Sequence, residues 1–289
     1  MLAQQVASGL AMGCLYALAA LGLVLIYKTS DMVNFAQGEM SMISTFVAYT
    51  FLSVAGLPLA AAFVLAVIFA GLFGLAVERA FLRPIQNAPV ITLMIVTLGL
   101  YLIFNGIAGW IWGYDPRSFP YAVVGGPLVV GKVIISRDSL LVMGVTLFLT
   151  LALYLVLRFS LAGIAMRATA QNAVMARLMG VPVKRVHSWA WGISAVLGAV
   201  AGILIAPTTF LDPNMMAEMN IKAFTAAVLG GFSSLPGAVA GGLLLGVLEN
   251  LVAGYISTEF KSTFAFGLII IVLWLRPHGL LGAHHRKKV

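Results

Sequence analysis

Long apolar runs separated by short polar connections dominate the chain. Reading each run against its flanking residues predicts nine membrane-spanning segments, near residues 6–27, 39–55, 58–78, 90–112, 139–157, 187–206, 219–234, 237–254 and 262–275. Only helices satisfy every backbone group in lipid in a sequence that lacks the alternation of a β-barrel. We therefore expect an all-α polytopic membrane protein with about eight or nine transmembrane helices. The seventh segment is short for a full crossing.

The composition agrees with this pattern. Of the 289 residues, 62% are hydrophobic and 9% are charged, whereas a soluble domain carries about 25% charged residues. No connection is long enough for a soluble domain with its own core, so we expect one transmembrane domain over residues 1–289. The single cysteine, Cys14, lies inside the first apolar run, which excludes a disulfide framework and a thiolate metal cage. We expect no metal site.

The net charge of +8 is distributed as a topology signal. The basic residues lie between apolar runs and in the C-terminal tail, so we set nucleic-acid binding aside. If the connections at 28–38, 79–89 and 158–186 and the tail from 276 are cytoplasmic, that side holds 12 of the 17 basic residues: Lys28, Arg79, Arg83, Arg158, Arg167, Arg177, Lys184, Arg185, Arg276, Arg286, Lys287 and Lys288. This bias predicts an external N-terminus and a cytoplasmic C-terminus.

An internal repeat emerges when residue numbers are shifted by 179. Gly13, Leu25, Ile26, Glu39 and Met40 then coincide with Gly192, Leu204, Ile205, Glu218 and Met219. In both copies a helix rich in small residues precedes a polar break, and Glu-Met opens the next helix. By the charge pattern, one break faces inside and the other outside, which indicates an inverted repeat. Chance matches between apolar segments are the alternative.

The first break, Asp31–Glu39, is too polar for a span yet lies between two apolar runs. It is either a helix cap in a short loop or a broken element that lines the translocation pathway. Glu39 is then the charge most worth testing, because the span interiors otherwise contain almost no carboxylates; Glu249, near a span end, can reach water. The candidate pathway residues are Asn34, Gln37, Glu39, Thr97, Asn105, Thr225, Ser233 and Ser234. For the hydroxyl and amide groups among them, a hydrogen bond between helices is the alternative.

Small residues spaced four apart indicate close helix packing. They are Gly198, Gly202, Gly237, Gly241, Gly242 and Gly246. Packing within the chain is the preferred interpretation, and a seam between two permeases is the alternative.

Residues 165–182 form a long connection that predicts a short cytoplasmic helix. Thr169 suits the N-cap, Gly180 the C′ position and Pro182 the stop beyond it. An Ala-rich and Met-rich helix outside the bilayer needs a docking surface, either on a partner protein or on its own bundle and the membrane interface. The candidate docking residues, to which the resemblance described below gives a coupling role, are Arg167, Thr169, Gln171, Asn172, Val174, Met175, Arg177, Leu178 and Gly180. The external loop at 113–138 could hold a hairpin that receives a binding protein, or could pack as a lid on its own helices.

Several motifs together resemble the H-type permease subunit of the high-affinity branched-chain amino-acid ABC importers. They are Asn-Phe-Ala-Gln-Gly-Glu at 34–39, Arg-Ala-x-Ala-Gln-Asn-Ala from Arg167, and the stretch from Lys222 to Gly231 that continues into Leu243–Glu249. The resemblance implies that residues 169–180 dock on an ATPase as a coupling helix. It also implies a second homologous permease, two ATPases that bind ATP and Mg²⁺, and a periplasmic solute-binding protein, all at the inner membrane.

The residues agree with a chain that is not itself an enzyme. It contains no Gly-x4-Gly-Lys-Ser/Thr phosphate-binding motif, so we expect ATP hydrolysis in the partners and no cofactor in this chain. The resemblance implies that the chain translocates leucine, isoleucine and valine. The alternatives are an importer of the same class for another amino acid, urea, a short amide or an aromatic acid, and a secondary transporter, which should contain buried ion-relay carboxylates.

Overall fold

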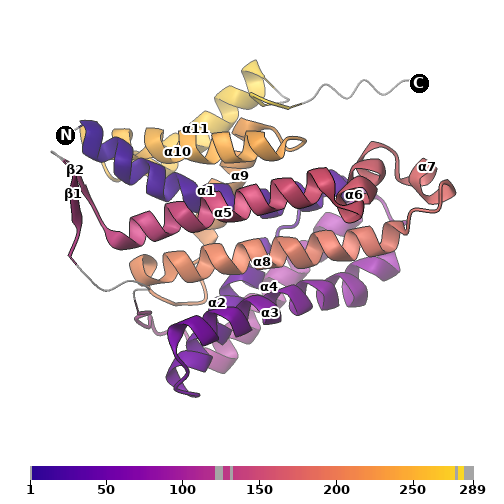
Figure 1. Cartoon of the computed structure of the whole chain (residues 1–289), viewed down its shortest axis with the longest axis horizontal. Coiled ribbons are helices and arrows are strands. Elements are labelled where there is room, and N and C mark those ends of the chain that lie inside the picture. The colour runs from indigo at the N-terminus through magenta and orange to yellow at the C-terminus, as the bar shows by residue number, and fades with distance from the viewer. Residues whose placement is uncertain (1, 121–125, 131–132, 277–278, 283–289) are drawn as a thin grey trace. The chain divides into compact units, whose positions relative to one another are not determined.

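The computed structural model describes residues 2–120, 126–130, 133–276 and 279–282 (Figure 1). Its elements in chain order are α1 (Leu2–Ser30), α2 (Gln37–Ser53), α3 (Leu59–Val77), the π-helix η1 (Glu78–Leu82), the 3-10 helix η2 (Arg83–Ile85), α4 (Val90–Trp112), β1 (Leu128–Val130), β2 (Val133–Ile135), α5 (Arg137–Phe159), α6 (Leu161–Gln171), α7 (Ala173–Leu178), α8 (Val183–Thr209), α9 (Ala217–Gly230), α10 (Leu235–Tyr255) and α11 (Phe260–Leu275). Each of the nine predicted segments contains a helix.

Six of the helical segments among the described residues are long and apolar enough to cross a membrane: α1, α3 with its continuation to Ile85, α4, α5, α8 and α10. The other three predicted spans form shorter helices, with 17 residues in α2, 14 in α9 and 16 in α11. A straight crossing needs about 20 residues. The positions of the helices were therefore predictable from the apolar runs. Their lengths depended on the polar residues at which each helix begins or ends.

A small hairpin interrupts the otherwise helical chain. Strands β1 and β2 pair antiparallel, with Leu128 opposite Ile135 and Val130 opposite Val133. The Gln4 side chain extends this pairing, because its amide donates to Ile134 O at 2.8 Å and accepts from Ile134 N at 2.8 Å. The loop at 113–138 therefore contains a hairpin, one of the two arrangements that the sequence left open; that it receives a binding protein stays a prediction.

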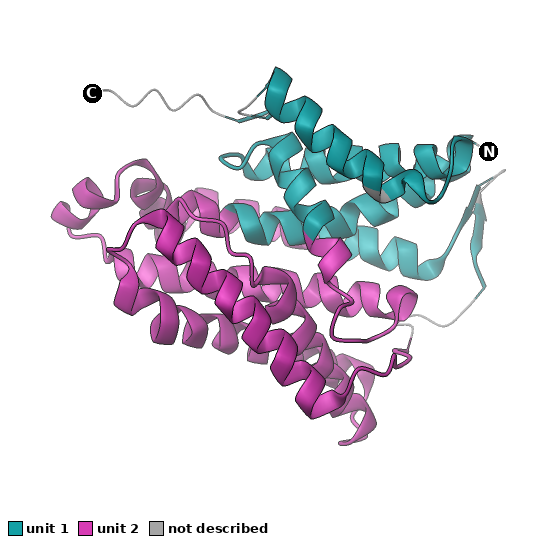
Figure 2. Ribbon diagram, turned by 180° about the vertical axis from the view of Figure 1, so that it is seen from behind, with its two compact units in different colours: residues 1–24, 123–147, 221–289 teal, residues 25–122, 148–220 magenta. Residues whose placement is uncertain are grey.

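The chain folds into two compact units, each assembled from segments distant in sequence (Figure 2). Unit 1 contains residues 1–24, 123–147 and 221–289, and unit 2 contains residues 25–122 and 148–220. The chain passes between the units four times: within α1, between residues 122 and 123, within α5 and within α9. The first and last of these passages concern the repeat. Helix α1 opens the first copy of the repeat suggested by the sequence, and α9 closes the second copy.

Unit 2 is held together by α2, α3 and α8, which pack on one another. Gly198 and Gly202 of α8 face Ser41 and Thr45 of α2, so an added Cβ at either position would meet those hydroxyl groups. On the other side of α8, an added Cβ at Gly74 of α3 would lie 2.6 Å from Trp191 O. The small residues therefore bring three backbones close together, which is the usual way in which helices associate in lipid.

In unit 1, small residues likewise allow close packing of α1, α9 and α10. An added Cβ at Gly242 would lie 2.6 Å from Ala17 N, and one at Gly9 would lie 2.7 Å from Val247 Cα. Gly246 packs on Gly13, Gly241 on Ala226 O, and Gly237 on Gly230. The structure thus places all six glycines singled out in the sequence in helix contacts within this chain.

Candidate functional site

The connection predicted as one cytoplasmic helix is in fact two helices. Helix α6 is capped by Ser160, whose hydroxyl accepts from Gly163 N at 3.0 Å. Thr169 lies inside α6, where its hydroxyl donates to Ala165 O, so its assignment as an N-cap was wrong. The cap is Asn172 instead: its side-chain oxygen accepts from Val174 N and Met175 N at 3.0 Å each and starts α7. Asn is among the strongest N-cap residues, so this start was available from the sequence.

Helix α7 ends as the sequence predicts. Gly180 has φ 84°, a conformation that glycine adopts without strain. Gly180 N donates to Arg177 O at 3.1 Å, and Val181 N donates to Ala176 O at 2.9 Å. These two bonds form a Schellman motif at the C-terminal end. With the Asn172 cap at the other end, both ends of this six-residue helix are fixed.

The outer face of α7 is apolar and exposed. Leu178 is 76% exposed and Met179 is 85% exposed, while Val174 and Met175 are also exposed. Only Ala176 of this helix is buried, and Arg177, Gln171 and Asn172 add polar groups around the apolar face. An exposed apolar patch with a polar rim is typical of a protein interface. Arg167 lies apart from it, with its guanidinium donating to Arg158 O at 3.3 Å.

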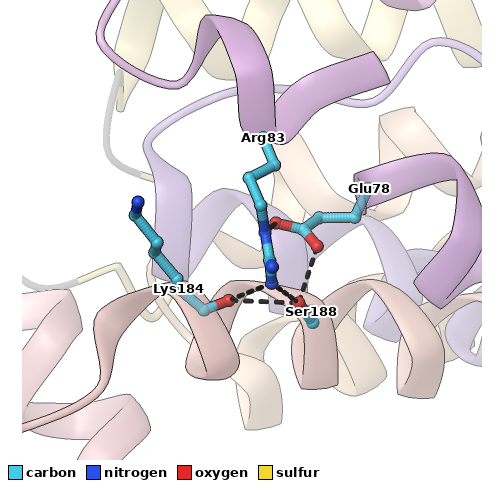
Figure 3. A network of polar contacts seen from close by, with 4 residues as sticks. All are labelled: Glu78, Arg83, Lys184 and Ser188. Carbon is cyan, nitrogen blue, oxygen red and sulfur yellow. Dashed lines mark hydrogen bonds and ion pairs between the residues drawn. The ribbon is translucent and has the colours of Figure 1, made fainter. Parts of the chain in front are cut away.

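A buried polar network ties the helix that follows α7 to the end of α3. Glu78 is buried, and one of its carboxylate oxygens accepts a hydrogen bond from the Ser188 hydroxyl at 2.6 Å. Arg83 forms an ion pair with the other oxygen at 3.5 Å and donates to Ser188 Oγ at 2.8 Å and to Lys184 O at 3.4 Å (Figure 3). Glu78 opens the π-helix; such turns are frequent at functional sites. Nothing in the sequence spacing of these residues had indicated their contact.

The polar break before α2 lies inside unit 2. Asn34 is fully buried, its Oδ1 accepts from Ala36 N at 3.0 Å, and its amide donates to Gln37 Oε1 at 3.3 Å. Gln37 in turn donates to Ser194 O at 2.9 Å. Phe35 N donates to the Thr97 hydroxyl of α4 at 3.3 Å. Irregular backbone is thus surrounded by protein, as it must be at membrane depth.

The second polar break, between α8 and α9, lies close to the first within unit 2. Asn105 of α4 donates to Pro213 O at 3.0 Å and to Asn214 Oδ1 at 3.2 Å, and Glu39 lies beside Asn105. Asn220 of α9 donates to Phe35 O at 3.5 Å. Five of the eight candidate pathway residues therefore gather in unit 2: Asn34, Gln37, Glu39, Thr97 and Asn105.

The other three candidates lie in unit 1. Thr225 is buried and its hydroxyl donates to Ile221 O of its own helix. Ser234 caps α10 by accepting from Gly237 N at 3.1 Å. Ser233 precedes it in the same turn. The bonds of Thr225 and Ser234 are those of helix structure.

Unit 1 contains a buried ion pair that the sequence had not indicated. Lys222 Nζ lies 2.6 Å from Glu249 Oε1, and the Tyr16 hydroxyl donates to Glu249 Oε2 at 2.6 Å. The expectation that Glu249 reaches water was wrong, because its carboxylate is buried where α1, α9 and α10 meet. With Glu78 and Glu249 buried, the expectation that Glu39 would be nearly the only interior carboxylate was wrong as well.

Comparison with known proteins gives a consistent result over nearly the whole chain. Residues 5–273 match the family described as the permease component of branched-chain amino acid transport systems. The chain is 35% identical to the high-affinity branched-chain amino acid transport system permease protein LivH of Escherichia coli K12, covering 99% of this chain and 97% of that protein. It is 34% identical to the corresponding protein BraD of Pseudomonas aeruginosa over the same shares.

A solved structure supports the fold. The structure of PsaBC from Streptococcus pneumoniae in complex with Fab matches with a TM-score of 0.52 at 14% identity, covering 94% of this chain and 91% of that chain. Together with the apolar helices, these matches identify a multi-pass membrane protein. The chain belongs to the family of permease components of branched-chain amino acid transport systems.

Proposed function

We propose that this chain is the membrane-spanning subunit of an ABC importer that carries leucine, isoleucine and valine across the bacterial inner membrane. The observation that carries the proposal is the similarity to LivH and BraD over 99% of the chain. The chain works with a second homologous permease in a heterodimer, two ATPases that hold ATP and Mg²⁺, and a periplasmic solute-binding protein. Its own contribution is the pathway through the membrane.

Helix α7 supports a role in coupling. Its exposed residues Val174, Met175, Leu178 and Met179 present an apolar surface, and a methionine-rich surface adapts to an irregular groove. The two capping motifs make this short helix a defined element that can transmit a displacement. In the proposed cycle, closure of the ATPases moves the segment from Arg167 to Gly180, and alternating access follows in the helices around the pathway.

The order of elements supports an inverted repeat. Helix α1, the break after Ser30 and α2 correspond to α8, the break after Thr209 and α9, and both short helices carry Glu-Met in their first turn. The first copy leads from unit 1 into unit 2, and the second leads from unit 2 into unit 1. With the positive residues on the cytoplasmic side, this arrangement gives an external N-terminus and a cytoplasmic C-terminus.

The test of coupling introduces an acidic side chain on the exposed surface of α7. Leu178→Glu and Arg177→Glu place an acidic group on the exposed face without touching the cap at Asn172 or the turn at Gly180. In proteoliposomes with all partners, we expect leucine uptake per ATP hydrolysed to fall about tenfold, since a buried contact at an interface centre contributes about 1–2 kcal/mol or more.

Asn87→Glu is the matched control. Asn87 is exposed in the connection before α4, in the same unit and on the same proposed side. It should leave uptake and its coupling to ATP hydrolysis unchanged. Normal coupled transport by both α7 variants would contradict the docking role, whereas the absence of leucine uptake by the wild-type complex would contradict the transport assignment.

A further inference from the structure

The two short helices α2 and α9 begin next to each other. An added Cβ at Gly38, in the first turn of α2, would lie 3.2 Å from Asn220 Cβ in the first turns of α9. Both helices follow a polar break, and both are shorter than a crossing requires. In transporters built from repeats, short or interrupted helices at corresponding positions mark the substrate site.

Glu39 is the unsatisfied group at this junction. It is 1% exposed, and its Oε2 has no hydrogen-bond partner. The neighbouring amide of Asn105 is shared with Pro213 and Asn214 of the second break. A buried carboxylate is costly unless a cation or several donors stabilise it.

The other two buried glutamates show what Glu39 lacks. Glu78 faces the Arg83 guanidinium, and Glu249 faces the Lys222 ammonium group and the Tyr16 hydroxyl. In the part of the chain that the structure describes, Glu39 forms no ion pair, and no group of three or more His, Cys, Asp or Glu side chains could hold a metal ion. An organic cation with hydrogen-bond donors fits this environment better than a metal ion does.

We propose that Glu39 is the subsite for the α-ammonium group of an amino acid in transit through the permease. The inference rests on the proposed function and names the group that contacts the substrate. An ammonium group carries three donors and can bind Oε2 in a charge-assisted hydrogen bond. The approach of a cation favours the ionised carboxylate, and the N-terminal end of α2 stabilises the same negative charge.

The amide side chains of the first break, Asn34 and Gln37, already have partners within unit 2. Gln37 is held by Ser194 of α8 through two hydrogen bonds, at 2.9 Å and 3.0 Å. Asn34 is held by Gln37 and by Ala36 N. Because these groups are already bonded within unit 2, we infer that recognition of the ammonium group belongs to Glu39 and not to the amide cluster as a whole.

The test compares Glu39→Gln with Glu39→Asp in the full complex reconstituted in proteoliposomes. Glu39→Gln keeps the shape of the side chain and removes its charge, so we expect [³H]leucine uptake to fall about tenfold to a hundredfold, as for loss of a charged hydrogen bond. Stimulation of ATP hydrolysis by the loaded binding protein should stay within about twofold of wild type. Glu39→Asp should retain more uptake than Glu39→Gln. The matched control is Glu259→Gln, at an exposed glutamate before α11.

A binding measurement separates recognition from folding. Millimolar leucine should raise the thermal unfolding midpoint of the wild-type complex without binding protein, and 4-methylpentanoate, which lacks the ammonium group, should not. Glu39→Gln should unfold at or above the wild-type midpoint without ligand, since it removes an uncompensated buried charge, and should show no shift with leucine.

Three outcomes would overturn the assignment. The first is wild-type uptake by Glu39→Gln, and the second is equal stabilisation of the wild-type complex by 4-methylpentanoate. The third is loss of uptake in Glu39→Gln with the leucine shift intact, which would place recognition of the ammonium group elsewhere. A wild-type complex that takes up no amino acid would instead overturn the proposed function itself. If Glu39→Gln does not assemble, Glu39→Asp, which draws the carboxylate back by one methylene, should weaken the leucine-induced shift, and an unchanged shift would overturn the assignment.

Discussion

At the residue scale, the three buried glutamates divide into two kinds. Glu78 and Glu249 each sit against a basic side chain and a hydroxyl group, which compensates for the loss of hydration. Glu39 has neither, and it lies where two polar breaks meet. The environment of each carboxylate therefore distinguishes groups that hold helices together from the one available to a substrate.

The Lys222–Glu249 pair gives a stability prediction. Lys222→Met leaves the Glu249 carboxylate buried without its cation, so we expect the complex in detergent to lose about 3–5 kcal/mol of stability. The double variant Lys222→Met with Glu249→Gln should recover most of this loss, because the remaining amide still accepts from the Tyr16 hydroxyl. Thermal unfolding of the purified complex measures both effects.

The control for this pair is Lys261→Met, which removes a partly exposed lysine in the same unit. It should change the unfolding midpoint little. Equal destabilisation by the single and double variants would show that the carboxylate does not depend on Lys222 for its compensation.

From the sequence we could single out an important glutamate, but we could not predict which residues each buried glutamate contacts. Glu39 was singled out because it opens a helix after a polar break, a local pattern. Glu249 was misplaced because its partners, Tyr16 and Lys222, come from two other helices. A hydropathy pattern records which segments are apolar, but contacts between residues hundreds of positions apart depend on how helices pack.

At the scale of elements, α7 is followed directly by the helix whose first turns take part in the polar network of Glu78 and Arg83. Helix α8 begins at Val183, shortly after α7 ends at Leu178, and its first two turns contain Lys184 and Ser188. Those residues bond to Arg83, which joins them to Glu78 at the end of α3. The start of α8, just after α7, is therefore bonded to the end of α3, so we expect a displacement of α7 to reach α3 through this polar contact.

Removing Arg83 should weaken this transmission. For Arg83→Gln we expect basal ATP hydrolysis to remain near wild type while leucine uptake per ATP falls at least about fivefold, the lower end of typical coupling energies. Uptake and phosphate release, measured on the same proteoliposomes, provide the ratio. The control is Arg79→Gln, at an exposed arginine in the π-helix η1 that opens with Glu78. If both arginine variants lower the ratio equally, the network has no particular role in coupling.

The boundaries of α6 and α7 show why helix-capping signals in the sequence predicted one helix end correctly and the other wrongly. Gly180 closes α7 because a Schellman motif requires only neighbouring residues, and its signal is unambiguous. Thr169 and Asn172 are both acceptable N-caps by type. The choice between them was decided by Ser160, which had already started α6 upstream.

At the scale of the whole molecule, the proposed topology can be tested with single cysteines. Cys14 is the only native cysteine and is buried, so Cys14→Ala provides a background without reactive thiols. Ser136→Cys, in the external loop, should react with a membrane-impermeant maleimide on intact cells. Asn87→Cys and Asn172→Cys should react only after permeabilisation.

This pattern requires α4 and α5 each to cross the membrane, since α4 separates residue 87 from residue 136 and α5 separates residue 136 from residue 172. Labelling of all three cysteines from outside would contradict the crossings. The reverse pattern would keep the crossings and invert the orientation derived from the basic residues.

The assembly of unit 1 from both ends of the sequence has a consequence for biogenesis. Helix α1 leaves the ribosome long before α10, yet its small-residue face packs on α10, through Gly9 against Val247 and Gly13 against Gly242 and Gly246. These contacts close a loop of more than two hundred residues, and contacts this distant form late. The nascent N-terminal helix must therefore remain inserted in lipid, or be held by the insertion machinery, until most of the chain has been synthesised.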